Sequence, residues 1–426
     1  MFSTNWQTSQ REYIVLIDRN VKIPLSDGIH LDSDVFRPDG DGPFPVILGI
    51  HPYVKDEQSM EIMPVAFSGE RASIETGDFN FYVRRGYVLV IANIRGTHAS
   101  EGYFGNIDPD SRTIQDIYEV IEWLADQSWC DGNVGMTGIS YFAVVQKRVA
   151  ALRPPHLKAI FAPYGWSDSY RDIYFRGGIM AHGFLDYWIR RYSPDYRVKN
   201  SLREAWGDEK YDQAVAAALE DRELTAVPGF KKALLSPDEG CHPLLCEIIL
   251  NPLYNDYYRE HAVDFSADTT IPAYFGGDWK GYGFHLSGDI RAFEKWKGPK
   301  KLSIGPGIYL DRPASWMKNR CSFLSTGPEN GNRLKTGRSP GQSGPPFICI
   351  QEGCSTSTNS GPMKGIPRLR THPITAAVSN SSHPPWWRAP KSAAPWSSTF
   401  SGPRRIRMSC GLSPSMIWMP GVRRNS

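Results

Sequence analysis

The sequence predicts an α/β protein built on a mostly parallel sheet with helices on both faces. Short continuous apolar runs, FPVILGI (residues 44–50) and GYVLVIANI (residues 86–94), are typical of strands buried on both faces. An amphipathic helix pattern follows in residues 113–127, where apolar side chains recur at spacings of three and four. Because strand and helix patterns alternate along the chain, we expect the strands to pair in parallel.

The other elements continue this alternation. Residues 21–38 consist of two alternating runs around Asp27-Gly28, a dipeptide suited to a tight turn, and predict an N-terminal hairpin. The remaining predicted elements are, in order, a strand running into a turn at 133–140, a helix at 141–152, strands at 157–165 and 270–279, a helix at 287–296 and a strand at 300–306.

Composition and pattern divide the chain into four segments. Residues 12–167 and 263–312 carry the strand–helix alternation, whereas residues 168–262 are aromatic-rich and mostly helical in pattern. We interpret residues 168–262 as a helical cap inserted between two parts of one core. In residues 313–426 no periodicity persists, and we expect an irregular tail that buries too little apolar surface to offset its ordering entropy.

Charge is unevenly distributed between these segments. Residues 313–426 hold 15 Lys and Arg against 2 Asp and Glu, and residues 1–312 hold 33 basic against 43 acidic side chains. A basic tail usually indicates nucleic acid or an anionic surface. Here the basic residues are dispersed and match no nucleic-acid-binding motif, so we expect no nucleic-acid partner.

Targeting and metal-binding signals are missing from the sequence. No N-terminal stretch combines a charged head with an apolar core, and no run reaches the ~18 apolar residues of a membrane helix. The seven cysteines show no zinc-ligand spacing and indicate free thiols in a reducing compartment, with Cys130 and Cys246 as buried small hydrophobes. We expect a cytoplasmic protein without a membrane partner, metal or organic cofactor.

Ser140 is the candidate nucleophile. It lies between a predicted strand and a predicted helix, two residues after Gly138. A sharp turn at this place lifts a serine hydroxyl out of the sheet, and the helix N-terminus favours developing negative charge. The usual motif has a second glycine two residues after the serine, where this chain has Phe142, so a turn serine without a catalytic role is the alternative.

The surrounding residues resemble the X-Pro dipeptidyl-peptidase and cocaine-esterase family of α/β-hydrolases. That family has Gly-x-Ser-Tyr-x-Gly-x-x-Gln after Trp-Cys-Asp-Gly-x-Val-Gly, and residues 129–143 read WCDGNVGMTGISYFA, with Ala143 in place of a glycine. Three further blocks match in order: SDGIHLDSDVFRPDGDGPFPVIL, HPYVKD and RRGYVLVIANIRGTHASEGYF. The resemblance covers roughly residues 12–312 and implies an α/β-hydrolase fold.

The resemblance also implies a mechanism and an oxyanion hole. The family contains serine hydrolases that cleave an ester or amide bond through an acyl-enzyme. Tyr53 matches the family tyrosine whose hydroxyl helps to form the oxyanion hole, and the backbone N–H of Tyr141 would be the second donor. The alternative for Tyr53 is an aromatic residue of the core or the rim.

The sequence departs from the family at the other two triad positions. Lys280 occupies the place of the acid and Tyr309 that of the histidine. Tyrosine does not replace neutral imidazole as a base near neutral pH without a large pKa shift. Asp278 and His285 are the best substitutes by position, and a desolvated Lys280 is another possible base. The other histidines near family motifs are His51, His98 and His182.

The match to the family stops abruptly after residue 312, and the tail shows signs of a reading-frame error. When the codons of residues 416–420 (MIWMP) are started at their third base, they encode Asp-(Leu/Met)-Asp-Ala. In that frame, residues 405–410 can encode Asp-Thr-Asp-Val-Val-Trp, and the family's C-terminal β-sandwich has such an Asp-Thr-Asp segment. We hypothesise that a frameshift or misassigned splice from about residue 313 replaces this β-sandwich.

Two functions therefore remain open. The first is a serine hydrolase acting on a small ester, an amide or a short peptide, with cap aromatics such as Trp166, Tyr187 and Trp188 lining an apolar pocket or simply forming the cap core. The second is a catalytically inactive relative that serves as a binding scaffold or is a truncated gene product. The sequence does not identify the substrate or the oligomeric state.

Overall fold

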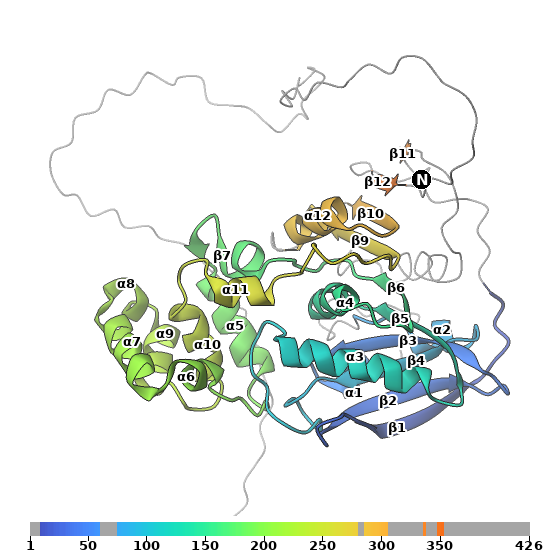
Figure 1. Ribbon diagram of the computed structural model, residues 1–426, viewed down its shortest axis with the longest axis horizontal. Coiled ribbons are helices and arrows are strands. Elements are labelled where there is room, and N and C mark those ends of the chain that lie inside the picture. The colour runs from blue at the N-terminus through green and yellow to red at the C-terminus, as the bar shows by residue number, and fades with distance from the viewer. Residues whose placement is uncertain (1–8, 60–74, 280–284, 306–334, 338–346, 353–426) are drawn as a thin grey trace, which may run out of the picture. The chain divides into compact units, whose positions relative to one another are not determined.

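A computed structural model of the 426-residue chain describes residues 9–59, 75–279, 285–305, 335–337 and 347–352. These residues form a ten-stranded sheet in the order β1-β2-β4-β3-β5-β6-β9-β10-β12-β11 (Figure 1). Its strands are β1 (Val15–Pro24), β2 (His30–Pro38), β3 (Phe44–His51), β4 (Val88–Asn93), β5 (Cys130–Thr137), β6 (Leu157–Phe161), β9 (Ala273–Asp278), β10 (Lys300–Gly305), β11 (Lys335–Gly337) and β12 (Phe347–Glu352).

The centre of the sheet is parallel, as the sequence predicts. Strands β4, β3, β5, β6, β9 and β10 pair in parallel in that spatial order. The outer pairs β1–β2, β2–β4, β10–β12 and β11–β12 are antiparallel. The predicted hairpin corresponds to β1 and β2, in which Pro24 pairs with His30. Gly28, in the turn, has a φ of +84°, a backbone conformation that residues with a side chain rarely adopt.

Apolar side chains of alternate residues in the central strands enter two cores on opposite faces of the sheet. In β4, Val88, Val90 and Ala92 belong to the larger core, and Leu89 and Ile91 belong to a smaller one. Helices α3 (Ser111–Ala125), α4 (Tyr141–Ala151) and α12 (Leu286–Lys295) contribute to the larger core, and α2 (Phe79–Val83) covers the smaller one. Burial on both faces explains the continuous apolar runs in the sequence.

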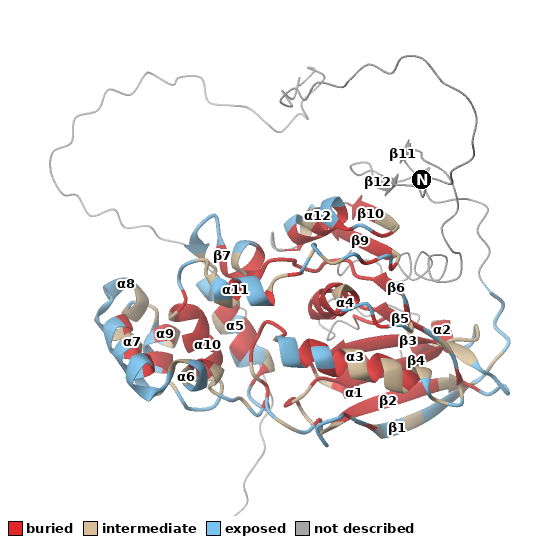
Figure 2. Cartoon of the chain, viewed as in Figure 1, coloured by how far each residue is buried: buried red, intermediate tan, exposed pale blue. Residues whose placement is uncertain are grey.

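A mostly helical insertion separates β6 from β9, although these two strands are neighbours in the sheet. It contains a π-helical turn (Tyr170–Tyr174), the short strands β7 (Phe175–Arg176) and β8 (Ile179–Met180), and helices α5 (His182–Tyr192), α6 (Ser201–Trp206), α7 (Asp208–Glu220), α8 (Arg222–Thr225), α9 (Pro228–Leu235), α10 (His242–Ile249) and α11 (Asp256–His261). Helices α7 and α8 are largely exposed, whereas the strands at the centre of the sheet are buried (Figure 2).

The predicted fold class, an α/β-hydrolase with an inserted helical cap, is confirmed. The short helix α1 (Lys55–Gln58) follows β3. Of the tail predicted to be irregular, the structure describes only β11 and β12, and the other residues from 313 onward lie outside the described part. Cys130 and Cys246 are buried free thiols, as predicted.

Candidate active site

Ser140 lies on a sharp turn between β5 and α4. It is the residue immediately before α4, and its φ of 60° and ψ of −123° are uncommon for a residue with a side chain. Its carbonyl accepts hydrogen bonds from the N–H groups of Ala143 and Val144, but its hydroxyl caps no backbone group of the helix. Ser140 as a whole residue is half-buried at this corner of the sheet.

Two neighbours explain why the chain turns here despite the unusual motif. Gly138 has a φ of +128°, and a Cβ at this position would lie 2.5 Å from Cβ of Phe142. Phe142, in the place of the motif's second glycine, is fully buried and stacks on the His51 ring at 4.4 Å between ring centroids. Burial, His98 and Lys55 all lower the pKa of His51, which is therefore a neutral packed ring.

Tyr53 lies just after β3 and beside the nucleophile turn. Its ring is 6.4 Å from that of Tyr141, and it also packs against Trp188 and Tyr192 of α5. Burial, followed by the charge of Glu75, raises the pKa of Tyr53 well above its ordinary value. The phenol therefore keeps its proton and remains a hydrogen-bond donor at neutral pH.

The backbone N–H of Tyr141 lies at the start of α4, whereas its side chain is buried in the core. As the first residue of α4, it has a backbone N–H with no acceptor inside the helix. Its side chain is fully buried and meets the Trp166 ring at 6.3 Å. The backbone, not the phenol, is thus the group of Tyr141 suited to binding a carbonyl oxygen.

Asp278 and His285 meet around Tyr164. Asp278 ends β9 and accepts a 2.9 Å hydrogen bond from the Tyr164 hydroxyl, and the His285 ring lies perpendicular to the Tyr164 ring at 6.0 Å. Burial and then the Lys147 cation lower the pKa of His285 to about 3, against the opposing charge of Asp278. Tyr164 also shares a buried cluster with Ile139, the residue before Ser140.

Sequence reasoning does not single out Tyr164. The apolar pattern places it at the end of a predicted strand, but β6 ends at Phe161, and Tyr164 has a φ of +56° and joins Asp278 to the nucleophile turn. A non-glycine residue held in this conformation is a common feature of functional sites. Lys280 and Tyr309, which occupy the family's acid and histidine positions, lie outside the described residues.

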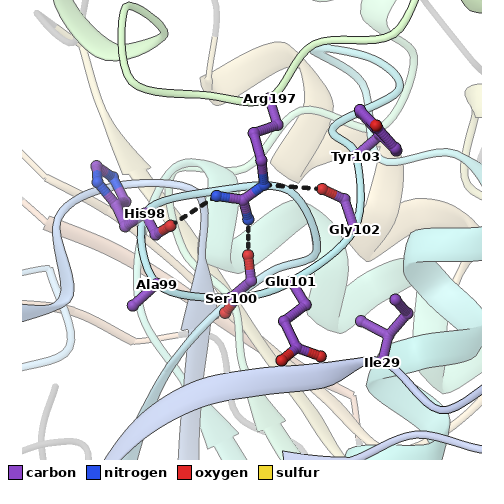
Figure 3. A pocket seen from close by; sticks show the side chains of 8 residues that line it. All are labelled: Ile29, His98, Ala99, Ser100, Glu101, Gly102, Tyr103 and Arg197. Carbon is purple, nitrogen blue, oxygen red and sulfur yellow. Dashed lines mark hydrogen bonds between the residues drawn. The ribbon is translucent and has the colours of Figure 1, made fainter.

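His98 lies apart from the candidate active site, in a cavity that Ser140 does not line. It lines an open cavity of about 470 Å³ together with Ile29, Ala99, Ser100, Glu101, Gly102, Tyr103 and Arg197 (Figure 3). Arg197, from the insertion, donates to the carbonyls of His98, Ser100 and Gly102 and so fixes this loop. Ser140 and the other predicted site residues do not line the cavity, and His182 begins α5.

Within the described ranges, no group of three or more His, Cys, Asp or Glu side chains is arranged to hold a metal ion. None of the helices in the same part of the chain is both long and apolar enough to cross a membrane.

The mostly parallel sheet and the serine on a strained strand-to-helix turn define a protein of the α/β-hydrolase class. Residues 27–310, about two thirds of the chain, match the family described as X-Pro dipeptidyl-peptidase (S15 family). The chain belongs to this family, and the resemblance seen in the sequence is confirmed.

Individual relatives are similar over shorter stretches. A cocaine esterase from Rhodococcus sp. (strain MB1 Bresler) is 38% identical over 160 residues, covering 37% of this chain and 25% of the esterase. A Lactobacillus delbrueckii subsp. lactis Xaa-Pro dipeptidyl-peptidase is 31% identical over 110 residues, covering 22% and 14% of the two chains. A CocE/NonD family hydrolase from Staphylococcus aureus has a TM-score of 0.54 at 27% identity, covering 73% of this chain and 50% of that one.

Two conclusions follow from these relatives. The chain is a member of a serine hydrolase family. It matches half or less of the length of each of these relatives.

Proposed function

We propose that the chain is a serine hydrolase that cleaves an ester or amide bond through an acyl-enzyme on Ser140. The observation that carries the proposal is the strained conformation of Ser140 at the start of α4, with Tyr53 packed beside the next residue. A strained serine turn of this kind is the usual setting of a nucleophile in this class of fold.

The proposed chemistry assigns a role to each group. The Ser140 oxygen attacks the substrate carbonyl, and the oxygen of that carbonyl gains negative charge. The Tyr53 hydroxyl and the Tyr141 N–H donate hydrogen bonds to this oxygen. The serine proton passes to the base and from it to the leaving alcohol or amine as the bond to the acyl carbon breaks. Water then hydrolyses the acyl-enzyme to the acid and restores the Ser140 hydroxyl.

His285 is the proposed base and Asp278 the proposed acid that orients it. Their shared contact with Tyr164, and the position of Tyr164 beside Ile139, support this assignment. The low pKa of His285 keeps the ring neutral and able to accept a proton. It also makes the ring a weak base, so we expect slow turnover that does not decline between pH 8 and pH 5.

Residues 168–262 are proposed to be the cap that shapes the acyl pocket. Two aromatic residues of α5, Trp188 and Tyr192, contact Tyr53 directly, which supports a pocket wall formed by the insertion next to the oxyanion donors. We propose a small ester, an amide or a short peptide as the substrate.

A fluorophosphonate probe tests the proposal, because it forms a covalent bond with an activated serine. We expect the folded full-length chain to be labelled, and the label to disappear in Ser140→Ala. Ser266→Ala removes an exposed serine whose hydroxyl donates to nearby Asp264, and we expect its labelling to equal that of the wild type.

An inactive relative is the second candidate function, and the deep burial of His285 favours it. A ring with a pKa of about 3 accepts the serine proton only at a free-energy cost. Absence of labelling in a chain that melts cooperatively would support this candidate over the hydrolase.

A further inference from the structure

A buried ion pair joins the helices that follow the proposed nucleophile and the proposed base. Ser140 immediately precedes α4, and His285 immediately precedes α12. Lys147 of α4 and Asp289 of α12 are both completely buried, and Nζ of the lysine lies 2.6 Å from Oδ1 of the aspartate. Burial raises the pKa of the Asp289 carboxyl to about 7 and lowers the pKa of Lys147. Breaking such a buried, hydrogen-bonded pair is costly, so the pair links the two helices.

The backbone of Gly165 completes the arrangement. Nζ of Lys147 donates to the Gly165 carbonyl at 2.8 Å, and Oδ2 of Asp289 accepts from the Gly165 N–H at 3.2 Å. A Cβ on residue 165 would lie 2.9 Å from Nζ of Lys147 and 2.7 Å from Cβ of Ala143. Gly165 follows Tyr164, so the same turn contacts the ion pair, Asp278 and His285.

Further contacts fix the first turn of α12. The Ser167 hydroxyl donates to the Gly288 carbonyl at 2.6 Å, and a Cβ on Gly288 would lie 2.5 Å from Cα of Trp166. The carboxylate of Asp172 accepts from the Ser287 hydroxyl at 2.8 Å and from Arg291 at 2.7 Å. The start of α12 is therefore attached to the segment after β6 by side chains on several of its residues.

We propose that the Lys147–Asp289 pair, which is hydrogen-bonded to the Gly165 backbone, sets the position of the N-terminus of α12 relative to the N-terminus of α4. His285 immediately precedes the first of these helices, and Ser140 immediately precedes the second. Lys147 and Asp289 are positioning residues in this account, because neither is assigned a contact with substrate. The inference rests on the proposed function, which gives Ser140 and His285 their chemical roles.

The pair also acts on the charge of the imidazole. Among the described residues, the charged and titratable groups that act on or pack against His285 include Lys147 from α4, Asp278 from β9 and Tyr164 from the turn after β6. On its own helix, Asp289 donates its backbone N–H to the His285 carbonyl at 3.1 Å. Burial is the largest cause that lowers the pKa of His285, and the Lys147 cation is the second. Removing this cation should therefore raise the pKa of the ring.

The first experiment compares the full-length double variant Lys147→Met/Asp289→Asn with the wild type. Removing both charges leaves no buried charge unpaired, and the new amide keeps an acceptor for the Gly165 N–H. We expect cooperative melting, with kcat toward a nitrophenyl ester lowered about 10- to 100-fold at an unchanged KM, as for a base displaced by about 1 Å. The higher pKa of His285 in this variant would by itself strengthen the base and raise kcat, so a fall in kcat reports displacement of the ring. Lys158→Met removes an exposed lysine of β6 and should keep the wild-type kcat.

A folded double variant with kcat within two-fold of the wild type would overturn the proposal, because the pair would then serve stability alone. Should the double variant not fold, Lys147→Gln/Asp289→Asn carries the same comparison, since it also leaves no buried charge unpaired and keeps a donor for the Gly165 carbonyl.

The second experiment does not depend on turnover. NMR titration of the His285 ring should show a higher midpoint in Lys147→Met/Asp289→Asn than in the wild type, and an unchanged midpoint contradicts the proposed action of Lys147 on the ring. If the titration midpoint of His285 rises but the fluorophosphonate does not label the wild-type chain, the proposed function fails while the action of Lys147 on the ring stands. Failure of the proposed function and failure of this inference therefore give different results.

Discussion

At the scale of single residues, the backbone at Ser140 and the burial of Tyr53 are the features that bear most on chemistry. The serine is held in a conformation that costs free energy, which the surrounding structure must supply. The phenol of Tyr53 stays protonated because it is buried among aromatic rings. Each of these local states can be tested with a substitution that removes very few atoms.

Tyr53→Phe removes one hydroxyl and should leave the packing of the ring unchanged. We expect kcat to fall about 10²- to 10³-fold, the usual loss for one oxyanion donor. Tyr82→Phe is the matched control, because this buried tyrosine of α2 belongs to the smaller core on the other face of the sheet and has no assigned role in the site. Equal kcat values in the two variants would contradict the assignment of Tyr53 to the oxyanion hole.

Glu247 of α10 makes stability depend on pH. Its Oε2 is buried without a hydrogen-bond partner among the described residues, and burial, with Asp110 and Asp108, raises its pKa well above the ordinary value. The folded chain then binds a proton that the unfolded chain releases, so this residue costs stability as pH rises above about 4.5.

Glu247→Gln should remove that pH dependence. We expect the Tm of the variant to exceed that of the wild type at pH 8 by at least about 2 °C and the difference to shrink at pH 5. Glu220→Gln, at an exposed position at the end of α7, should change Tm at neither pH. A Tm difference that is the same at both pH values would exclude a buried protonated carboxyl at Glu247.

At the scale of elements, the segment after β3 that carries Tyr53 is anchored to β2. Lys55 of α1 is buried, with Nζ 2.6 Å from Asp34 and 3.4 Å from Asp32. Burial alone would raise the pKa of Asp34, but hydrogen bonds from Lys55, the Asn20 N–H and Arg19 outweigh it and lower the pKa. The stability from Asp34 is therefore present above the ordinary pKa of an aspartate and is lost as pH falls through the lowered value.

Lys55→Met should be strongly destabilising, since it leaves Asp34 buried with less compensation. We expect a loss of about 3–5 kcal/mol in the free energy of unfolding, measured with urea. Lys22 approaches Asp32 at 3.3 Å but is 44% exposed, so Lys22→Met should cost no more than about 1 kcal/mol. Similar losses of unfolding free energy in both variants would show that the buried Lys55–Asp34 pair contributes no more to stability than the exposed Lys22–Asp32 pair.

At the scale of the whole molecule, the relatives are longer than the part of them that this chain matches. The family match ends at residue 310, close to the point where the charge and composition of the sequence change. We propose that residues from about 313 onward derive from a frameshift or misassigned splice in place of a β-sandwich.

The coding nucleotides test this proposal. We expect the alternative frame to remain open through the region of residues 313–426 and to encode Asp-Thr-Asp about ten residues before a second Asp-containing segment. Stop codons in that frame, or a frame without β-sandwich sequence, would contradict a shift and leave the basic tail as a genuine part of the chain.

The sequence by itself determined the α/β-hydrolase class, the succession of strands and helices along the core, and the place of Ser140 between a strand and a helix. These features depend on local patterns: apolar runs for strands buried on both faces, and a short motif where β5 meets α4. Phe142 departs from the motif, but its stacking on His51 shows that the turn accommodates a large ring.

Only the tertiary structure decided which distant groups meet. Asp278 and Tyr164 are 114 residues apart, and Lys147 and Asp289 are 142 apart, with no spacing rule that links them. They come together because β6 and β9 are neighbours in the sheet while the insertion lies between them in sequence. Strand order depends on the packing of the whole core, whereas a sequence motif records only its immediate neighbours.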